Sequence, residues 1–204
     1  MKKVKIALLM LLAFVLILPA CKKGPNDPFL SLKSRKARLV GEWELKEGTT
    51  TTTGIDIWGG NSYSFTQIYT FSGTTRTFTG SYDGTPYTPV TILYTQNVTF
   101  DKDETYENVT NDDGDIYTEK GGWYFGGANK EFELKNKETV LMSATSYTST
   151  SGSSSYTGTD AMGYPSVWLL DELSSKELIV SFDGTSSNSG GSSTTTGTLT
   201  FEKN

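Results

Sequence analysis

Histidine is absent from this chain of 204 residues, and cysteine occurs once. Without histidine there is no imidazole general base, no serine–histidine or cysteine–histidine nucleophile, and no imidazole ligand for a metal. A single cysteine excludes an intrachain disulfide and a thiolate metal cluster. These absences remove the side chains of the commonest hydrolytic and metal-dependent reactions. We therefore expect a protein that is not an enzyme and that holds neither a metal nor a cofactor.

Hydroxyl side chains and glycine are abundant instead. The chain contains 31 threonines, 22 serines and 21 glycines, and 12% of its residues are aromatic. Threonine, tyrosine and phenylalanine favour the pleated surface of a strand, whereas serine and glycine favour turns. The composition therefore predicts an all-β protein, although it indicates no ligand.

Residues 1–20 have the pattern of a bacterial export signal. Three lysines among the first five residues precede the apolar run Ile6–Leu18, which is shorter than the roughly 20 residues that span a bilayer. The segment Leu18-Pro19-Ala20-Cys21 resembles a lipobox, at which bacterial lipoproteins are acylated on the cysteine and cleaved before it. The resemblance implies a lipid-bearing Cys21. The alternative is an ordinary signal peptide with an incidental cysteine.

The charge of the chain and the residues after Cys21 indicate a location. Cleavage before Cys21 would remove three lysines and no acid, leaving 15 basic and 23 acidic groups and a net charge of −8. This balance disfavours nucleic acid, which requires a basic face. Several acyl chains, palmitate among them, would anchor the protein to a membrane stably. Lys22 and Lys23 do not form an acidic inner-membrane retention signal, so we expect an outer-membrane lipoprotein.

A tether and a helix are expected to connect the anchor to the folded domain. Residues 21–28 are polar and contain glycine and proline, as in a flexible linker. Residues 29–40 place apolar side chains near helical spacing and predict a short helix. The helix and the domain that follows it would then occupy residues 29–204.

Alternation of apolar and polar residues predicts strands in the rest of the chain. Tyr63–Phe71 and Val90–Phe100 alternate with a period of two. We count nine or ten hairpin-connected strands, a number that a barrel and a β-sandwich both allow. Three hydroxyl-rich runs have few apolar residues and are expected to be long mobile hairpin loops: residues 49–53, 146–155 and 186–196.

Two segments resemble the lipocalin-like lipoproteins of Gram-negative outer membranes. Leu39-Val40-Gly41-Glu42-Trp43 looks like the G-x-W signature of lipocalins, and Trp168–Val180 resembles the late hairpin of that group. The resemblance implies a single antiparallel up-and-down barrel preceded by a short helix, with the Trp43 side chain closing one end. The alternative fold is a β-sandwich.

Aromatic residues at alternate positions form the candidate binding site. Tyr63, Phe65, Tyr69 and Tyr94 would face inward, together with two glutamines, and Trp43 would lie at the closed end. Such side chains would line a barrel interior of mixed polarity. This interior would suit a small amphipathic molecule, such as a lipid or glycan fragment. The alternative is that these side chains only fill the core.

Other candidate sites have ordinary explanations. Asn111–Asp115 lacks the ligand spacing of a calcium loop and fits a hairpin turn. The acidic pairs lie in turns without an apolar pocket that would raise a carboxyl pKa for glycosidase chemistry. We therefore expect a non-catalytic binding lipoprotein of the cell envelope. The alternative is an accessory subunit of an outer-membrane protein complex that uses its loops and barrel surface for protein contacts.

Overall fold

The computed structural model describes residues 34–126, 138–159 and 166–204. The signal segment, Cys21, the tether and residues 29–33 of the expected helix lie outside this described part. Within it, twelve strands join one sheet and a short helix precedes them, so the all-β prediction is confirmed. The elements are α2 (Arg35–Leu39), β1 (Gly41–Trp58), β2 (Asn61–Ser72), β3 (Thr75–Tyr82), β4 (Thr85–Pro86), β5 (Val90–Phe100), β6 (Thr105–Asp112), β7 (Asp115–Gly126), β8 (Glu138–Ser151), β9 (Ser154–Gly158), β10 (Ser166–Leu173), β11 (Glu177–Asn188) and β12 (Gly191–Lys203).

Ten of the strands form a closed antiparallel barrel. Neighbours follow the order β10-β11-β12-β1-β2-β3-β5-β6-β7-β8, and the pairing of β8 with β10 closes the ring. The closed ring confirms the predicted single barrel and excludes a sandwich of two separate sheets. The short strands β4 and β9 pair with β3 and β8 outside the ring.

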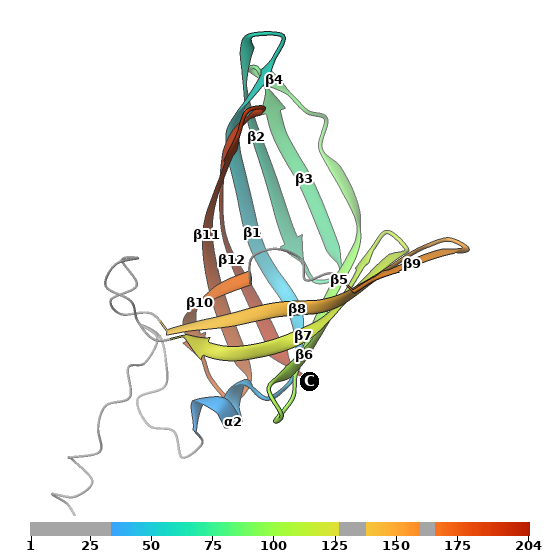
Figure 1. Ribbon diagram of the computed structural model, residues 1–204, viewed down its shortest axis with the longest axis vertical. Coiled ribbons are helices and arrows are strands. Elements are labelled where there is room, and N and C mark those ends of the chain that lie inside the picture. Colours follow the sequence, from blue (N-terminus) through green and yellow to red (C-terminus); the bar gives the residue numbers. More distant parts are fainter. Residues whose placement is uncertain (1–33, 127–137, 160–165) are drawn as a thin grey trace, which may run out of the picture.

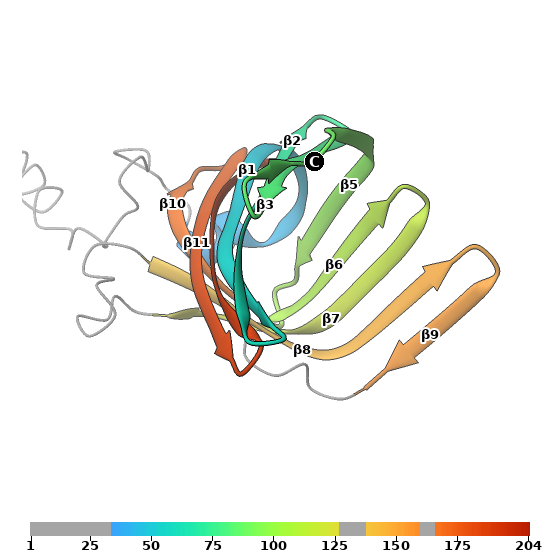
Figure 2. The same cartoon turned by 90° about the horizontal axis from the view of Figure 1, so that it is seen from above.

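The barrel is narrower at one end than at the other. At the end beside α2, which we call the base, Gly41–Glu44 of β1 pair directly with Asn97–Phe100 of β5. Farther from α2, the β2–β3 hairpin lies between these two strands. The base is therefore a ring of eight strands that widens to ten toward the opposite, open end. There the wall from β10 to β3 and the wall from β5 to β9 diverge (Figure 1, Figure 2).

The apolar core fills the base. Trp43, Phe100 and Phe201 are completely buried there, and the Trp168 ring stacks on Phe201 with 5.3 Å between the ring centroids. Buried residues recur at every second position near the base in β1, β5, β11 and β12. Because successive strand side chains point to opposite faces, this pattern shows which residues of each strand face the barrel interior.

Trp43 occupies the closed end of the barrel. Its indole Nε1 donates a hydrogen bond to the Leu39 carbonyl oxygen at 2.6 Å. The Nζ of Lys203 lies 4.8 Å from the centre of the Trp43 ring and donates hydrogen bonds to the carbonyl oxygens of Arg38 and Val40. The helix, the first strand and the last strand therefore meet around one aromatic side chain.

Within the described residues, the leading helix begins at Arg35 and ends at Leu39, beneath the base (Figure 1). The Ser34 hydroxyl caps it by accepting a hydrogen bond from the Ala37 N–H at 3.1 Å. Arg38 is almost completely buried and donates to the Leu173 carbonyl oxygen, while Arg35 forms an ion pair with Glu138 of β8. These contacts fix the helix against two strands of the barrel.

The three hydroxyl-rich runs are strands, and the prediction that they form long mobile loops is wrong. Residues 49–53 lie in the middle of β1 and pair with β2 on one side and β12 on the other. Residues 146–155 and 186–196 belong to the β8–β9 and β11–β12 hairpins, whose turns contain Gly152 and Gly190. Threonine is β-branched and suits a half-exposed pleated surface, so backbone pairing orders these segments without an apolar core.

Candidate ligand-binding site

Above the core, aromatic side chains cover the inward side of β2, β3 and β5, and Tyr87 from the β4–β5 connection packs against them. We call this surface the aromatic face. Its members alternate with outward residues and share the inward side with the buried Phe71 and Val98. All of them are half-buried: Tyr63, Phe65, Tyr69, Phe78, Tyr82, Tyr87 and Tyr94.

Most rings of the aromatic face pack against a neighbouring ring, both near the open end and beside the core. Tyr63 stacks on Tyr82, with 5.9 Å between centroids and 17° between the ring planes. The remaining ring pairs are Tyr69–Phe78 at 5.2 Å, Phe78–Tyr87 at 5.3 Å and Phe71–Tyr94 at 5.0 Å. Such pairs stabilise one another beyond their buried area, so the face is a preformed surface.

Arg76 lies at the end of the aromatic face that is nearest the core, between Tyr69 and Tyr94. Its guanidinium carbon is 5.0 Å from the centre of the Tyr69 ring and 5.1 Å from that of Tyr94, and Nη2 donates to Asp112 Oδ1 at 3.0 Å. Burial raises the pKa of Tyr94, while a hydrogen bond with Thr110 and the Arg76 cation oppose the shift. The sequence analysis did not select Arg76 as a site residue. Its position two residues before Phe78, on the same side of the strand, could have indicated a cation among the aromatic side chains.

Amide and carboxylate groups line the inward side of β5, β6 and β7 below Arg76. The Gln96 side-chain amide donates to Asn108 Oδ1 at 3.1 Å. The Tyr106 hydroxyl donates a short hydrogen bond to Glu119, and burial together with this carboxylate raises the pKa of Tyr106. Polar groups that can bind a ligand therefore lie between the aromatic face and the apolar core.

The strands β11 and β12, which β1 separates from the aromatic face, carry glycine and small hydroxyl side chains on their inward side. A Cβ at Gly197 would lie 2.5 Å from the Phe182 ring, so that ring packs directly on the backbone, whereas a Cβ at Gly184 would have no atom within 4 Å. Two other residues that face the barrel interior are also exposed: 50% of the surface of Val90 and 46% of that of Tyr117 is accessible to solvent. The interior near the open end is therefore accessible to solvent rather than filled by side chains.

The structure brings together only some of the residues that the sequence suggested as a site. Tyr69 and Tyr94 lie on either side of Arg76. Tyr63 and Phe65 belong to the same face but lie nearer the open end. Trp43 is separated from them, because it is completely buried in the base. Cys21, the expected lipid attachment site, lies outside the described residues.

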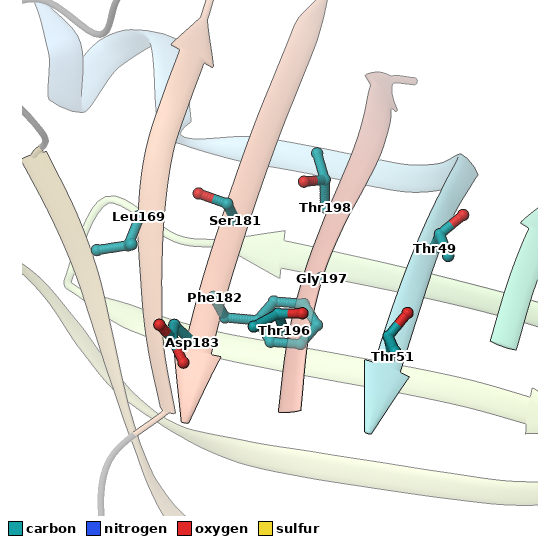
Figure 3. A pocket seen from close by; sticks show the side chains of 9 residues that line it. All are labelled: Thr49, Thr51, Leu169, Ser181, Phe182, Asp183, Thr196, Gly197 and Thr198. Atoms are coloured by element: carbon teal, nitrogen blue, oxygen red, sulfur yellow. The ribbon is translucent and has the colours of Figure 1, made fainter. Parts of the chain in front are cut away.

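A polar hollow of about 450 Å³ lies on the outer side of β10, β11, β12 and β1 (Figure 3). Ser181 and Thr198 are paired across β11 and β12, next to the buried pair Val180 and Leu199. Because neighbouring strand residues face opposite sides, Ser181 and Thr198 point away from the core. Hydroxyl side chains supply five of the nine lining residues, and Asp183 adds a carboxylate. This hollow is therefore a poor site for a lipid chain, and no pattern in the sequence indicated it.

No protein-family model, curated protein or solved structure matches the chain. Among the described residues, no helix combines the length and the apolar character that crossing a bilayer requires. Within the same ranges, no three carboxylates or thiols gather as metal ligands would. The function must therefore be inferred from the geometry of the barrel itself.

Proposed function

We propose that this protein is a non-catalytic lipoprotein of the outer membrane that holds a small amphipathic molecule against the aromatic face. One observation carries the proposal. Seven half-buried aromatic rings form one surface that reaches from the open end to the Arg76–Asp112 ion pair, which Tyr69 and Tyr94 flank above the base that Trp43 occupies. A concave surface with apolar walls and a few converging polar groups is the usual form of a small-molecule site, and barrel mouths commonly hold one.

The state of the nearby carboxylates supports binding rather than catalysis. Asp112 pairs with Arg76, and Glu119 accepts the hydrogen bond of the Tyr106 hydroxyl. A general acid or base needs a carboxyl group free to reach substrate, with a pKa suited to proton transfer. Groups already engaged in this way are better suited to orienting a ligand than to transferring its protons.

The ligand test uses the full-length protein, purified from membranes in mild detergent and extracted for mass spectrometry. We expect a recurring small molecule in the extract, and its loss from the Tyr69→Ala/Tyr94→Ala double variant. Tyr124→Ala is the matched control, because Tyr124 is 53% exposed and points outward from β7. An extract without a recurring molecule, or one unchanged in the double variant, would contradict the proposal.

The anchor is tested separately through Cys21. The Cys21→Ala variant should leave the membrane fraction or remain uncleaved, and its mass should lack acyl chains. Unchanged fractionation and unchanged mass would show that the lipobox resemblance is misleading. Neither result affects the ligand test, because Cys21 lies outside the described barrel.

A second candidate function is an accessory role in an outer-membrane protein complex. It is favoured by the apex of the β1–β2 hairpin, where Trp58 is 80% exposed beside Ile55 and Ile57, which are 45% and 47% exposed. Exposed aromatic anchors of this kind are common at protein interfaces. Isolation in mild detergent should then yield a stoichiometric partner that Trp58→Ala loses and Tyr124→Ala retains.

A further inference from the structure

The aromatic face is long and narrow rather than round. Tyr63 and Tyr69 are six positions apart on β2, which corresponds to roughly 20 Å at about 3.3 Å per residue. The β3 rings of Tyr82 and Phe78 pack beside these two residues and double the width of the strip. A surface of this shape fits an extended molecule with several rings better than a compact one.

The polar group at the lower end of the strip is electrically neutral. The Asp112 carboxylate pairs with the Arg76 guanidinium, so the site offers a donor and an acceptor side by side without a net charge. The Arg76 and Asp112 side chains are 22% and 26% exposed, so a ligand can reach both. Adjacent hydroxyl groups need this combination of donor and acceptor, whereas an anionic headgroup gains little from a neutralised cation.

The charge of the open end also disfavours an anion. The described turns at this end carry Asp83 and Asp113 but no lysine or arginine. Carboxylates at the entrance repel fatty acids, phosphates and acidic sugars. A neutral ligand is not repelled in this way.

The exposure of the inward residues argues against a lipid chain. A lipid chain gains free energy only where its apolar surface leaves water, and drug-sized ligands are usually buried by 70–90% or more. Here Val90 and Tyr117 remain about half accessible, and the space at Gly184 is empty. Sugar rings differ because their C–H faces can cover an aromatic ring while their hydroxyl edges stay hydrated.

From these observations we infer that the ligand of the aromatic face is a neutral saccharide chain. Its rings stack on the tyrosines along β2 and β3, and its hydroxyl groups bond to the Arg76–Asp112 pair at the lower end of the strip. This inference rests on the proposed function, because it specifies the class of ligand that the same face binds.

The experiment applies the full-length protein to an array of neutral glycans, and isothermal titration calorimetry then measures the strongest glycans. The detergent must be an amine oxide rather than a glucoside or maltoside, because a sugar headgroup would compete. We expect binding that weakens about tenfold or more in Tyr63→Ala/Tyr82→Ala, which removes a stacked pair. Tyr124→Ala should bind as the unmodified protein does, and Tyr63→Phe should stay within about twofold because it keeps the ring.

The outcomes separate the ligand class from the function. Binding of sodium oleate or of acidic glycans alone, with no neutral glycan bound, would overturn the inference and leave the binding function intact. Equal affinity in Tyr63→Ala/Tyr82→Ala, with an unchanged urea midpoint, would show that the saccharide binds elsewhere and would also overturn it. If neither glycans nor oleate bind and the membrane extract contains no recurring molecule, the inference and the proposed function both fail.

Discussion

Strands such as β11 and β12 run from the base to the open end of the barrel but carry different side chains in the two halves. Along β11, the inward residues near the base are Leu178 and Val180, both completely buried. Toward the open end the inward residues are Gly184 and Ser186, both exposed. The β11–β12 ladder nevertheless continues through both halves, from Glu177 to Asn188. Strand pairing in this barrel therefore does not require a local apolar core.

This division separates the apolar core from the proposed binding surface. Burial of apolar surface is the main favourable term in folding, and here it is concentrated at the base. The open half depends on backbone pairing with neighbouring strands and keeps its aromatic surface partly accessible. Regions with few buried contacts open more easily than the core, so we expect the open half to be the less stable part.

Replacement of tryptophans at the two ends should give the largest difference. Trp43→Ala deletes a completely buried side chain and should lower the free energy of unfolding by about 3–5 kcal/mol. Trp58→Ala removes a side chain that is 80% exposed and should change it by less than about 0.5 kcal/mol. Urea unfolding followed by circular dichroism measures both values. Similar losses in the two variants would contradict the concentration of stability at the base.

Two glycine substitutions on the inward side of β11 and β12 should give a smaller difference. Gly197→Ala places a Cβ 2.5 Å from the Phe182 ring and 3.0 Å from the Thr49 carbonyl oxygen, which should cost about 1–3 kcal/mol. Gly184→Ala meets no atom within 4 Å and should be neutral within about 0.5 kcal/mol or slightly stabilising. The same urea titrations apply. A destabilising Gly184→Ala would indicate that the interior is filled.

The smallest effect concerns the β5–β6 turn at the base. The hydroxyl of Thr105 donates to Asp103 at 2.7 Å, and this bond, with a backbone N–H bond, lowers the pKa of the Asp103 carboxyl. Because the folded-state pKa is below the unfolded one, the stabilisation is present above the unfolded pKa and is lost as the pH falls through the folded pKa. Thr105→Val should raise the Asp103 pKa in an NMR titration, whereas Thr105→Ser should not.

Several parts of the fold follow from local sequence patterns. The alternation in Tyr63–Phe71 predicts β2, the resemblance around Trp168–Val180 predicts the β10–β11 hairpin, and both are present. The strand nature of residues 49–53 was not predictable from composition alone, because a threonine run has no inward apolar position to mark it. One of its partners, β12, comes from the other end of the chain.

The centre of the candidate site depends on contacts that the sequence does not display. Tyr69, Arg76 and Tyr94 lie on three strands, and Asp112 lies on a fourth. These four residues lie close together because of the registers of the β2–β3, β3–β5 and β5–β6 pairs. The alternation places each of these residues on the inward side, but it does not place them at the same height. For this reason the sequence suggested Tyr69 and Tyr94 and missed the cation between them.

The change from eight strands to ten determines the route by which a ligand can travel. Barrel diameter grows with strand number, so the end beside α2 is the narrow one, and Trp43 and Lys203 obstruct it. The chain leads from Cys21 into α2, and acyl chains on that cysteine would hold the obstructed end toward the bilayer. A molecule could then enter or leave only through the aqueous phase on the far side. Such traffic would favour ligands that diffuse freely in water over those that partition into the membrane.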